Sequence, residues 1–182
     1  MKIRGFTLLE LLVTIAIAAI LLAVAAPSFT GIIRGNALSS ARDGLYSALQ
    51  YARSEALTRN VAVAVCAAAD ENLNACSDDE DAWANGWLVF IDSSTGNGAT
   101  IAAANTDILR VHEGSNGIEV KYVTNGGGKH VRYLSSGILA SGFTGGVFSL
   151  CDVDDEARAR SVLIGTVAGQ IRTGGEDDAD CT

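Results

Sequence analysis

Hydrophobic residues form one long, nearly uninterrupted run close to the start of the chain. Residues 11–26 are apolar except for Thr14, and a single acidic residue, Glu10, stands directly before them. At about 1.5 Å per residue, a helix from Phe6 to Pro27 is roughly 33 Å long, which matches a bilayer core of about 30 Å. The pattern therefore predicts a membrane-spanning helix with a carboxylate near its start.

Beyond this run, apolar residues recur at steps of three and four positions, the spacing of one face of an α-helix. The stripe consists of Leu38, Ala41, Leu45, Leu49, Ala52 and Ala56. It predicts that the helix continues and packs this face on a globular domain. We expect the helix to end near Asn60, because Asn tolerates the left-handed conformation of a helix cap.

From Val61 onwards the hydrophobic period changes to two, which indicates β-strands. Short apolar runs bounded by Gly-, Asn- and Ser-rich turns predict strands near residues 61–66, 86–92, 108–113, 118–123, 131–134, 146–152, 161–167 and 170–173. Residues 125–128, Asn-Gly-Gly-Gly, are a strong turn signal. The predicted class is α+β, with a long N-terminal helix packed on an antiparallel sheet or small β-sandwich.

The distribution of charged residues predicts how the chain is oriented in the membrane. The 182-residue chain has a formal net charge of −8, so as a whole it repels nucleic acid and anionic lipid. Lys2 and Arg4 precede the apolar run and Arg34 follows it. This bias favours an N-terminus inside the cell and a globular domain outside.

Glu10 needs a partner, because a charge inside an apolar segment costs about 2.5–3.5 kcal/mol on insertion scales. If the chain were cut after the small residue Gly5, Phe6 would carry a new α-amino group one helical turn before Glu10. An amine and a carboxylate attract strongly at low dielectric. The pair can form within one chain or between two chains, and the second arrangement makes Glu10 an assembly residue.

These residues resemble a known signal. The run Gly5-Phe6-Thr7-Leu8-Leu9-Glu10 before an apolar helix resembles the class III signal of type IV pilins and pseudopilins. The resemblance implies cleavage after Gly5 by a prepilin peptidase, N-methylation of Phe6 and a filament role for Glu10. It divides the chain into a leader (1–5), a transmembrane and assembly half of the helix (6–35) and a periplasmic globular domain (36–182).

Two further stretches resemble one branch of this family, GspH/FimT/FimU. They are the run Ala52-Arg53-Ser54-Glu55-Ala56 at the end of the helix and the strand that begins with Trp83-Ala84-Asn85-Gly86-Trp87. The alternatives for the N-terminus are a signal peptide cleaved after Ala25 and a plain membrane anchor in which Glu10 is incidental. N-terminal sequencing separates the three, since the protein would begin at Phe6, Ala26 or Met1.

Four cysteines lie in the exported part, and an even count there indicates two disulfides. Three pairings exist, and we favour Cys66–Cys76 with Cys151–Cys181 because each joins nearby chain. In the loop-entropy model these contribute about 3 and 4 kcal/mol. The spacings match no zinc pattern.

The sequence offers little for catalysis. His112 and His130 lie in separate predicted strands, no glycine-rich loop opens a helix, and no G-x-S-x-G elbow occurs. Acidic runs at 78–81, 152–156 and 176–178 suggest calcium, but none has the Asp-x-Asp-x-Asp-Gly spacing, so solvated loops are expected. We expect no enzyme activity, cofactor or metal.

DNA is an alternative ligand. Some FimT-type proteins bind DNA through a G-R-x-R pattern near the C-terminus, and the matching residues here are Gly169-Gln170-Ile171-Arg172, with Gln170 in place of one arginine. A basic patch would come from Lys121, Lys129, His130, Arg132, Arg158, Arg160 and Arg172. The candidate DNA contacts are Lys121, Lys129, Arg132 and Arg172.

The sequence thus predicts a minor pilin, a structural subunit at the tip or in the initiation complex of a type IV pilus. The alternatives are a GspH-type pseudopilin of the type II secretion system and a DNA-binding minor pilin for DNA uptake. The expected partners are other pilins, the prepilin peptidase and the inner membrane.

Overall fold

The computed structural model describes residues 6–77, 79–94, 107–124, 129–142, 145–166 and 168–181, and for residues 24–29, Glu80 and Glu156 it describes the backbone alone. The expected leader up to Gly5, the turn at residues 125–128 and Asp78 of the first acidic run lie outside the described residues. The chain divides into two compact units, Met1–Asn36 and Ala37–Thr182.

One helix, α1 (Leu8–Arg59), belongs to both units. It ends where the sequence predicts, because Asn60 adopts a left-handed backbone conformation with φ of 56°. Within the described part of the chain, no helical segment meets both the length and the apolar character needed to cross a membrane.

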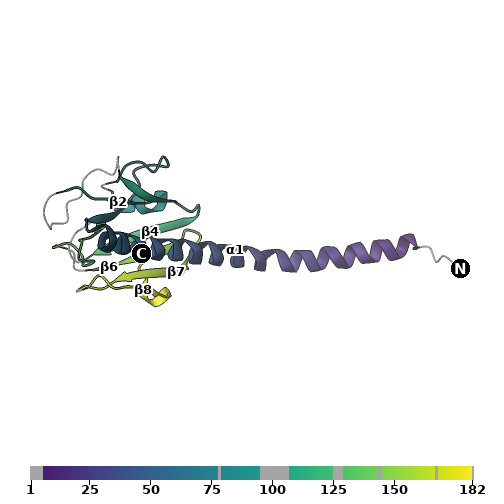
Figure 1. The fold of residues 1–182 in the computed structure, drawn as a ribbon. Helices are drawn as coiled ribbons and strands as arrows, with labels where there is room; N and C mark the ends of the chain where they lie inside the picture. The colour runs from purple at the N-terminus through teal and green to yellow at the C-terminus, as the bar shows by residue number, and fades with distance from the viewer. Residues whose placement is uncertain are drawn as a thin grey trace. The chain divides into compact units, whose positions relative to one another are not determined.

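The second unit contains two antiparallel four-stranded sheets, whose strands lie around the C-terminal part of α1 (Figure 1). The first sheet has the order β3-β2-β1-β5 and the second β4-β6-β7-β8. The strands are β1 (Val63–Ala67), β2 (Gly86–Ile91), β3 (Ile108–Glu113), β4 (Ile118–Thr124), β5 (His130–Tyr133), β6 (Gly146–Asp152), β7 (Asp155–Ile164) and β8 (Ile171–Gly174). The α+β class predicted from the sequence is confirmed.

The main core lies between the apolar stripe of α1 and the inner faces of both sheets. All six residues of the predicted stripe are buried, and Ala48 joins them. The strands contribute Val63 and Val65 from the first sheet and Phe148 and Leu150 from the second. The three-and-four spacing of small and aliphatic residues therefore places the helix against the sheets, as expected for a 3.6-residue period.

A short 3-10 helix, η1 (Glu80–Asn85), contributes Ala82 and Trp83 to this core. Its Trp83 is fully buried and packs edge-on against Phe148, with ring centroids 4.7 Å apart. Asp79 caps η1 by accepting a hydrogen bond from the Asp81 N–H at 3.1 Å. The first acidic run was expected to be a plain solvated loop, and instead its described residues begin a helix that inserts a tryptophan.

The structure pairs Cys66 with Cys76 and Cys151 with Cys181, the two short-range pairings favoured from the sequence. The second disulfide holds the C-terminal tail on the outer face of the second sheet. There the Asp180 N–H donates to Ser149 Oγ at 2.8 Å, and Ser161 Oγ donates to the Gly175 carbonyl at 3.3 Å. Both serines are buried under the tail as a result.

The start predicted for one strand was too late in the sequence. β7 begins at Asp155, not near residue 161, so the acidic run at 152–156 is a tight hairpin between β6 and β7 and not a long loop. The hairpin is closed by the Asp152 carboxylate, which accepts from the Asp154 N–H at 3.0 Å. Side-chain capping by Asp is a common turn device, and it allows charged residues to lie at a strand boundary.

Candidate functional site

The first turn of α1 contains a helix cap that the sequence reasoning missed. Thr7 precedes the helix, and its Oγ1 accepts a hydrogen bond from the Glu10 N–H at 3.2 Å. Thr-x-x-Glu is the capping-box pattern, so the signal was present in the sequence. Glu10 therefore lies in the first turn of α1, where a carboxylate is also favoured by the helix dipole.

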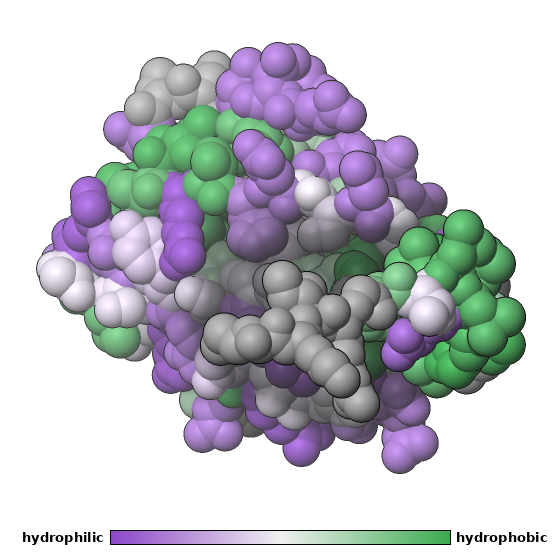
Figure 2. Space-filling view, turned by 90° about the vertical axis from the view of Figure 1, so that its right-hand side faces the viewer, coloured by the Kyte–Doolittle hydropathy of each residue, from purple (hydrophilic) through white to green (hydrophobic). Residues whose placement is uncertain are grey.

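Large apolar side chains are exposed all along the described part of the first unit. Phe6 is 71% exposed, Leu22 is 70% exposed and Ile32 is 60% exposed. In Figure 2, hydrophobic residues (green) gather in one large patch at the right of the view. A row of uncovered apolar side chains of this length is typical of a surface that lipid or other protein chains cover.

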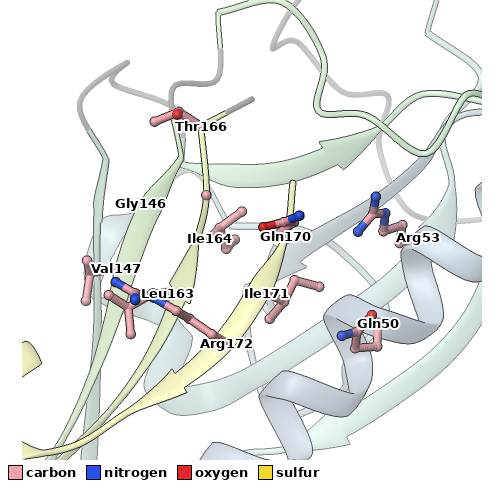
Figure 3. A pocket seen from close by; sticks show the side chains of 11 residues that line it. Gln50, Arg53, Gly146, Val147, Leu163, Ile164, Thr166, Gln170, Ile171 and Arg172 are labelled. Atoms are coloured by element: carbon pink, nitrogen blue, oxygen red, sulfur yellow. The ribbon is translucent and has the colours of Figure 1, made fainter. Parts of the chain in front are cut away.

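A groove of about 680 Å³ lies in the second unit beside β8 (Figure 3). Gln50 and Arg53 of α1 lie on one side, and Arg172 of β8 lies on the other with Leu163 of β7 and Val147 of β6. Arg172, Leu163 and Val147 are register partners across the three strands, so their side chains share one face of the sheet. The groove therefore presents two arginines among partly buried aliphatic side chains.

The two arginines of the groove are held differently. Arg53 is half-buried, and its Nε donates to the Gly137 carbonyl at 2.9 Å. Arg172 is exposed and makes no ion pair within the described part of the chain. The sequence reasoning identified Arg172 but not Arg53. The pattern of a helix does not show which of its arginines will lie near β8, a strand from the C-terminal part of the chain.

The structure corrects one of the four candidate DNA contacts. Arg132 is only 1% exposed and forms an ion pair with Asp92, so its guanidinium cannot reach a phosphate. Its place in β5, two residues after His130, gave no sign of burial.

The other three candidates lie in different parts of the two sheets. Lys129 precedes β5 in the first sheet, whereas Lys121 of β4 and Arg172 of β8 belong to opposite edge strands of the second sheet. Lys121 also has an acidic neighbour, Glu119, at 3.8 Å. The strand order therefore does not gather these side chains on adjacent strands into one basic patch.

The described residues also offer no evident metal site. Among residues that the structure describes, no three His, Cys, Asp or Glu side chains come together in a way that could hold a metal ion. The four cysteines are all engaged in the two disulfides.

Comparison with protein-family models decides the family. The model described as type II transport protein GspH matches residues 41–168. The chain belongs to the GspH family. A second model, the prokaryotic N-terminal methylation motif, matches residues 1–26 of this GspH-family chain. Together the two matches span the apolar N-terminal run and most of the globular unit.

Two solved structures have a similar fold. Both are crystal structures of the type IV minor pilin FimU of Pseudomonas aeruginosa (strain PAO1), each 25% identical to this chain. The structure in space group P21 has a TM-score of 0.59 and covers 81% of this chain and 95% of the FimU chain. The structure in space group P65 has a TM-score of 0.57 and covers 80% and 98%. No curated protein sequence matches this chain significantly.

The protein is thus a minor pilin or pseudopilin of the GspH/FimT/FimU type, as the sequence resemblance predicted. The family and the fold are those of structural pilin subunits. The methylation motif and the family imply a membrane-anchored, pilus-associated protein that assembles with other pilins.

Proposed function

We propose that this GspH-family protein is a minor pilin that joins the tip or the initiation complex of a type IV pilus after its leader is removed. The observation that carries the proposal is the exposed apolar helix of the first unit, which is capped by Thr7, has Glu10 in its first turn and matches the methylation motif. A helix with this surface is covered first by the lipid of the inner membrane and then by the helices of neighbouring subunits. Head-to-tail packing of such helices gives an open helical filament.

Glu10 sets the register of assembly in this proposal. Cleavage after Gly5 by the prepilin peptidase makes Phe6 the first residue, and its N-methylated amine remains cationic. The amine of one subunit pairs with the Glu10 carboxylate of the next, so that two opposite charges in the apolar interior compensate each other. The Thr7 cap supports this role, because it fixes the first turn that presents the carboxylate.

The globular unit would lie in the periplasm and present its loops and edge strands to partner pilins. The similarity to FimU supports a type IV pilus, whereas the family description supports the alternative, a pseudopilus of the type II secretion system. Loss of twitching motility on gene deletion, with normal protein secretion, would support the pilus. The opposite result would support the secretion system.

The assembly role is tested with Glu10→Gln in the full-length protein. We expect normal leader cleavage, normal amounts in the membrane and loss of the protein from sheared filaments. Thr14→Ala is the matched control, because Thr14 lies one turn later in the same helix and its Oγ1 bonds only locally, to the Leu11 carbonyl at 2.8 Å. Filaments that contain normal amounts of the Glu10→Gln protein would contradict the proposal.

A further inference from the structure

β8 is an edge strand, and its outer side has no backbone partner within the described residues. The Gly165 N–H donates to the Gln170 carbonyl at 2.7 Å, which fixes the alternation of the ladder between β7 and β8. Arg172 and Gly174 then direct their backbone groups to β7, and Ile171 and Thr173 direct theirs away from it. Two N–H groups and two carbonyls therefore face outwards along β8.

The protein treats another edge strand differently. The outer edge of β5 is covered by its own chain, since the Ala140 N–H donates to the Arg132 carbonyl at 2.9 Å and the Leu134 N–H donates to the Ile138 carbonyl at 2.9 Å. Natural sheets generally cover or blunt their edges, because an open edge is a template for another strand. At β8 no backbone group of the described residues pairs with the outer edge, and the groove lies at the start of the strand, at Gln170, Ile171 and Arg172.

The groove gives this edge two chemically distinct sides (Figure 3). On one side Arg172 lies over the face that Leu163 and Val147 share, and on the other side Gln50 and Arg53 of α1 lie near Ile171. An added strand directs successive side chains to opposite sides. One set of its side chains would therefore meet Arg172, and the alternate set would meet Arg53.

We propose that β8 pairs with an extended, acidic segment of a different pilin subunit, whose backbone continues the second sheet and whose carboxylates meet Arg172 and Arg53. The inference rests on the pilin-subunit function proposed above and deepens it by naming the docking edge. In this mode the main-chain hydrogen bonds supply affinity and the side-chain sites supply specificity. An acidic occupant complements the charge of the groove, because both charged side chains that line it are arginines. They form a locally basic site in a chain whose net charge is −8.

A peptide fits this edge better than a nucleic acid. A polypeptide backbone offers both the donors and the acceptors that match Ile171 and Thr173, whereas a phosphate backbone offers acceptors alone. Val147, Leu163 and Ile171 are half-buried aliphatic residues that favour an apolar side chain over a phosphate.

The test uses the full-length protein in cells that produce the complete set of pilins of its filament. The photo-cross-linking residue p-benzoylphenylalanine replaces Gln170, which is exposed and lines the groove. We expect an adduct with another pilin, and mass spectrometry should place the cross-link in an acidic, extended segment. Arg172→Glu should reduce the yield of this adduct at least about tenfold, because it sets like charges against each other.

Two further variants separate docking from folding. Thr173→Pro removes an N–H that points away from β7, so the protein should fold while the adduct is lost. Arg158→Glu is the matched control for charge reversal, since Arg158 is half-exposed on β7, pairs with Asp155 at 3.1 Å and does not line the groove. This control should leave the adduct yield unchanged.

A second cross-linker at Leu12 reports assembly through the N-terminal helix. If Leu12 traps other pilins and Gln170 does not, or if Arg172→Glu and Thr173→Pro leave the Gln170 adduct unchanged, the docking inference is overturned and the pilin function stands. If neither position traps a pilin, both proposals fail together. An adduct at Gln170 with a second copy of this chain, or one that nuclease removes, would also overturn the inference.

Discussion

Arg132 and Asp92 form a buried ion pair that joins two strands of the first sheet that are not neighbours. Arg132 lies on β5 and Asp92 directly follows β2, with β1 between them in the sheet. The Asp92 carboxylate also accepts from the N–H and the Oγ of Ser94, at 2.9 and 2.8 Å, while Arg132 Nη2 donates to the Ser94 carbonyl at 3.1 Å. The guanidinium thus fixes the chain that leaves β2.

Replacing Arg132 with Ala should destabilise the protein by about 3–5 kcal/mol, because it leaves the Asp92 charge buried without its cation. Urea unfolding of the full-length protein in detergent, followed by tryptophan fluorescence, measures this change. Both tryptophans of the chain, Trp83 and Trp87, are buried and report on the core. Arg158→Ala removes a half-exposed pair and should cost less than about 1 kcal/mol, so equal costs for the two variants would show that burial of the pair is unimportant.

Gly44 of α1 makes room for the ring of His112 on β3. A Cβ at position 44 would lie 2.4 Å from His112 Nε2, and the ring cannot retreat freely because it stacks on Trp87 with centroids 4.1 Å apart. Gly44→Ala should therefore destabilise the protein by about 1–3 kcal/mol, although Ala is the better helix former by about 1 kcal/mol.

The sign of this effect should reverse once the ring is removed. In a His112→Ala background, Gly44→Ala should stabilise the protein, because only the gain in helix propensity remains. Thermal unfolding of the four proteins of the double-mutant cycle measures the coupling. Additive effects of the two substitutions would mean that the contact does not govern the choice of glycine.

The disulfide between Cys151 and Cys181 should stabilise the C-terminal tail more than it stabilises the core. Replacing both cysteines with Ser should lower stability by up to about 4 kcal/mol in the loop-entropy model. Hydrogen exchange should locate the loss, because the Asp180 amide is protected by Ser149 Oγ. In the Cys66→Ser, Cys76→Ser double variant that amide should keep its protection, and fast exchange there in both variants would argue against a local effect.

The sequence predicts the helix and most strands well, because periodicity reports on the face that each residue turns to the core. The stripe from Leu38 to Ala56 is buried as its spacing requires, and Asn60 ends the helix by a local backbone preference. Hydrophobic periodicity and turn residues give wrong predictions where charged residues form hairpins or cap helices. β7 starts inside an acidic run because Asp152 closes the hairpin, and Asp79 begins η1.

The residues of the candidate site also differ in how far the sequence predicts them. The roles of Glu10 in assembly and of Phe6 in processing stay predictions, and the sequence allows them because they depend on local spacing. Arg132 is misread and Arg53 is missed because their roles depend on which distant segment lies opposite, Asp92 in one case and β8 in the other. A charged side chain gives no sign in the sequence of whether it will be paired inside the protein or left at a groove.

Two buried tyrosines should make the protein sensitive to alkaline pH. The hydroxyl groups of Tyr122 and Tyr133 are buried without a hydrogen-bond partner among the described residues. Burial raises the pKa of both phenols well above their ordinary value; at Tyr122 the neighbouring Tyr133 adds to the rise, and at Tyr133 the charge of Arg53 opposes it. The folded state therefore holds these protons more tightly than the unfolded state does.

Because folding raises the pKa of each phenol, the contribution of the protonated phenol to the free energy of unfolding is fully present below the unfolded pKa of about 10. This contribution is lost as the pH rises above that value. Each tyrosine should then reduce the unfolding free energy by up to about 1.4 kcal/mol per pH unit. Tyr133→Phe should leave stability at pH 7 equal or higher, since it removes an unpaired buried hydroxyl, and it should flatten the decline between pH 10 and 11.5. Urea unfolding at a series of pH values measures both effects, with Tyr46→Phe on α1, which is only partly buried, as the control. An unchanged slope above pH 10 in Tyr133→Phe would show that the phenol ionises without unfolding the protein.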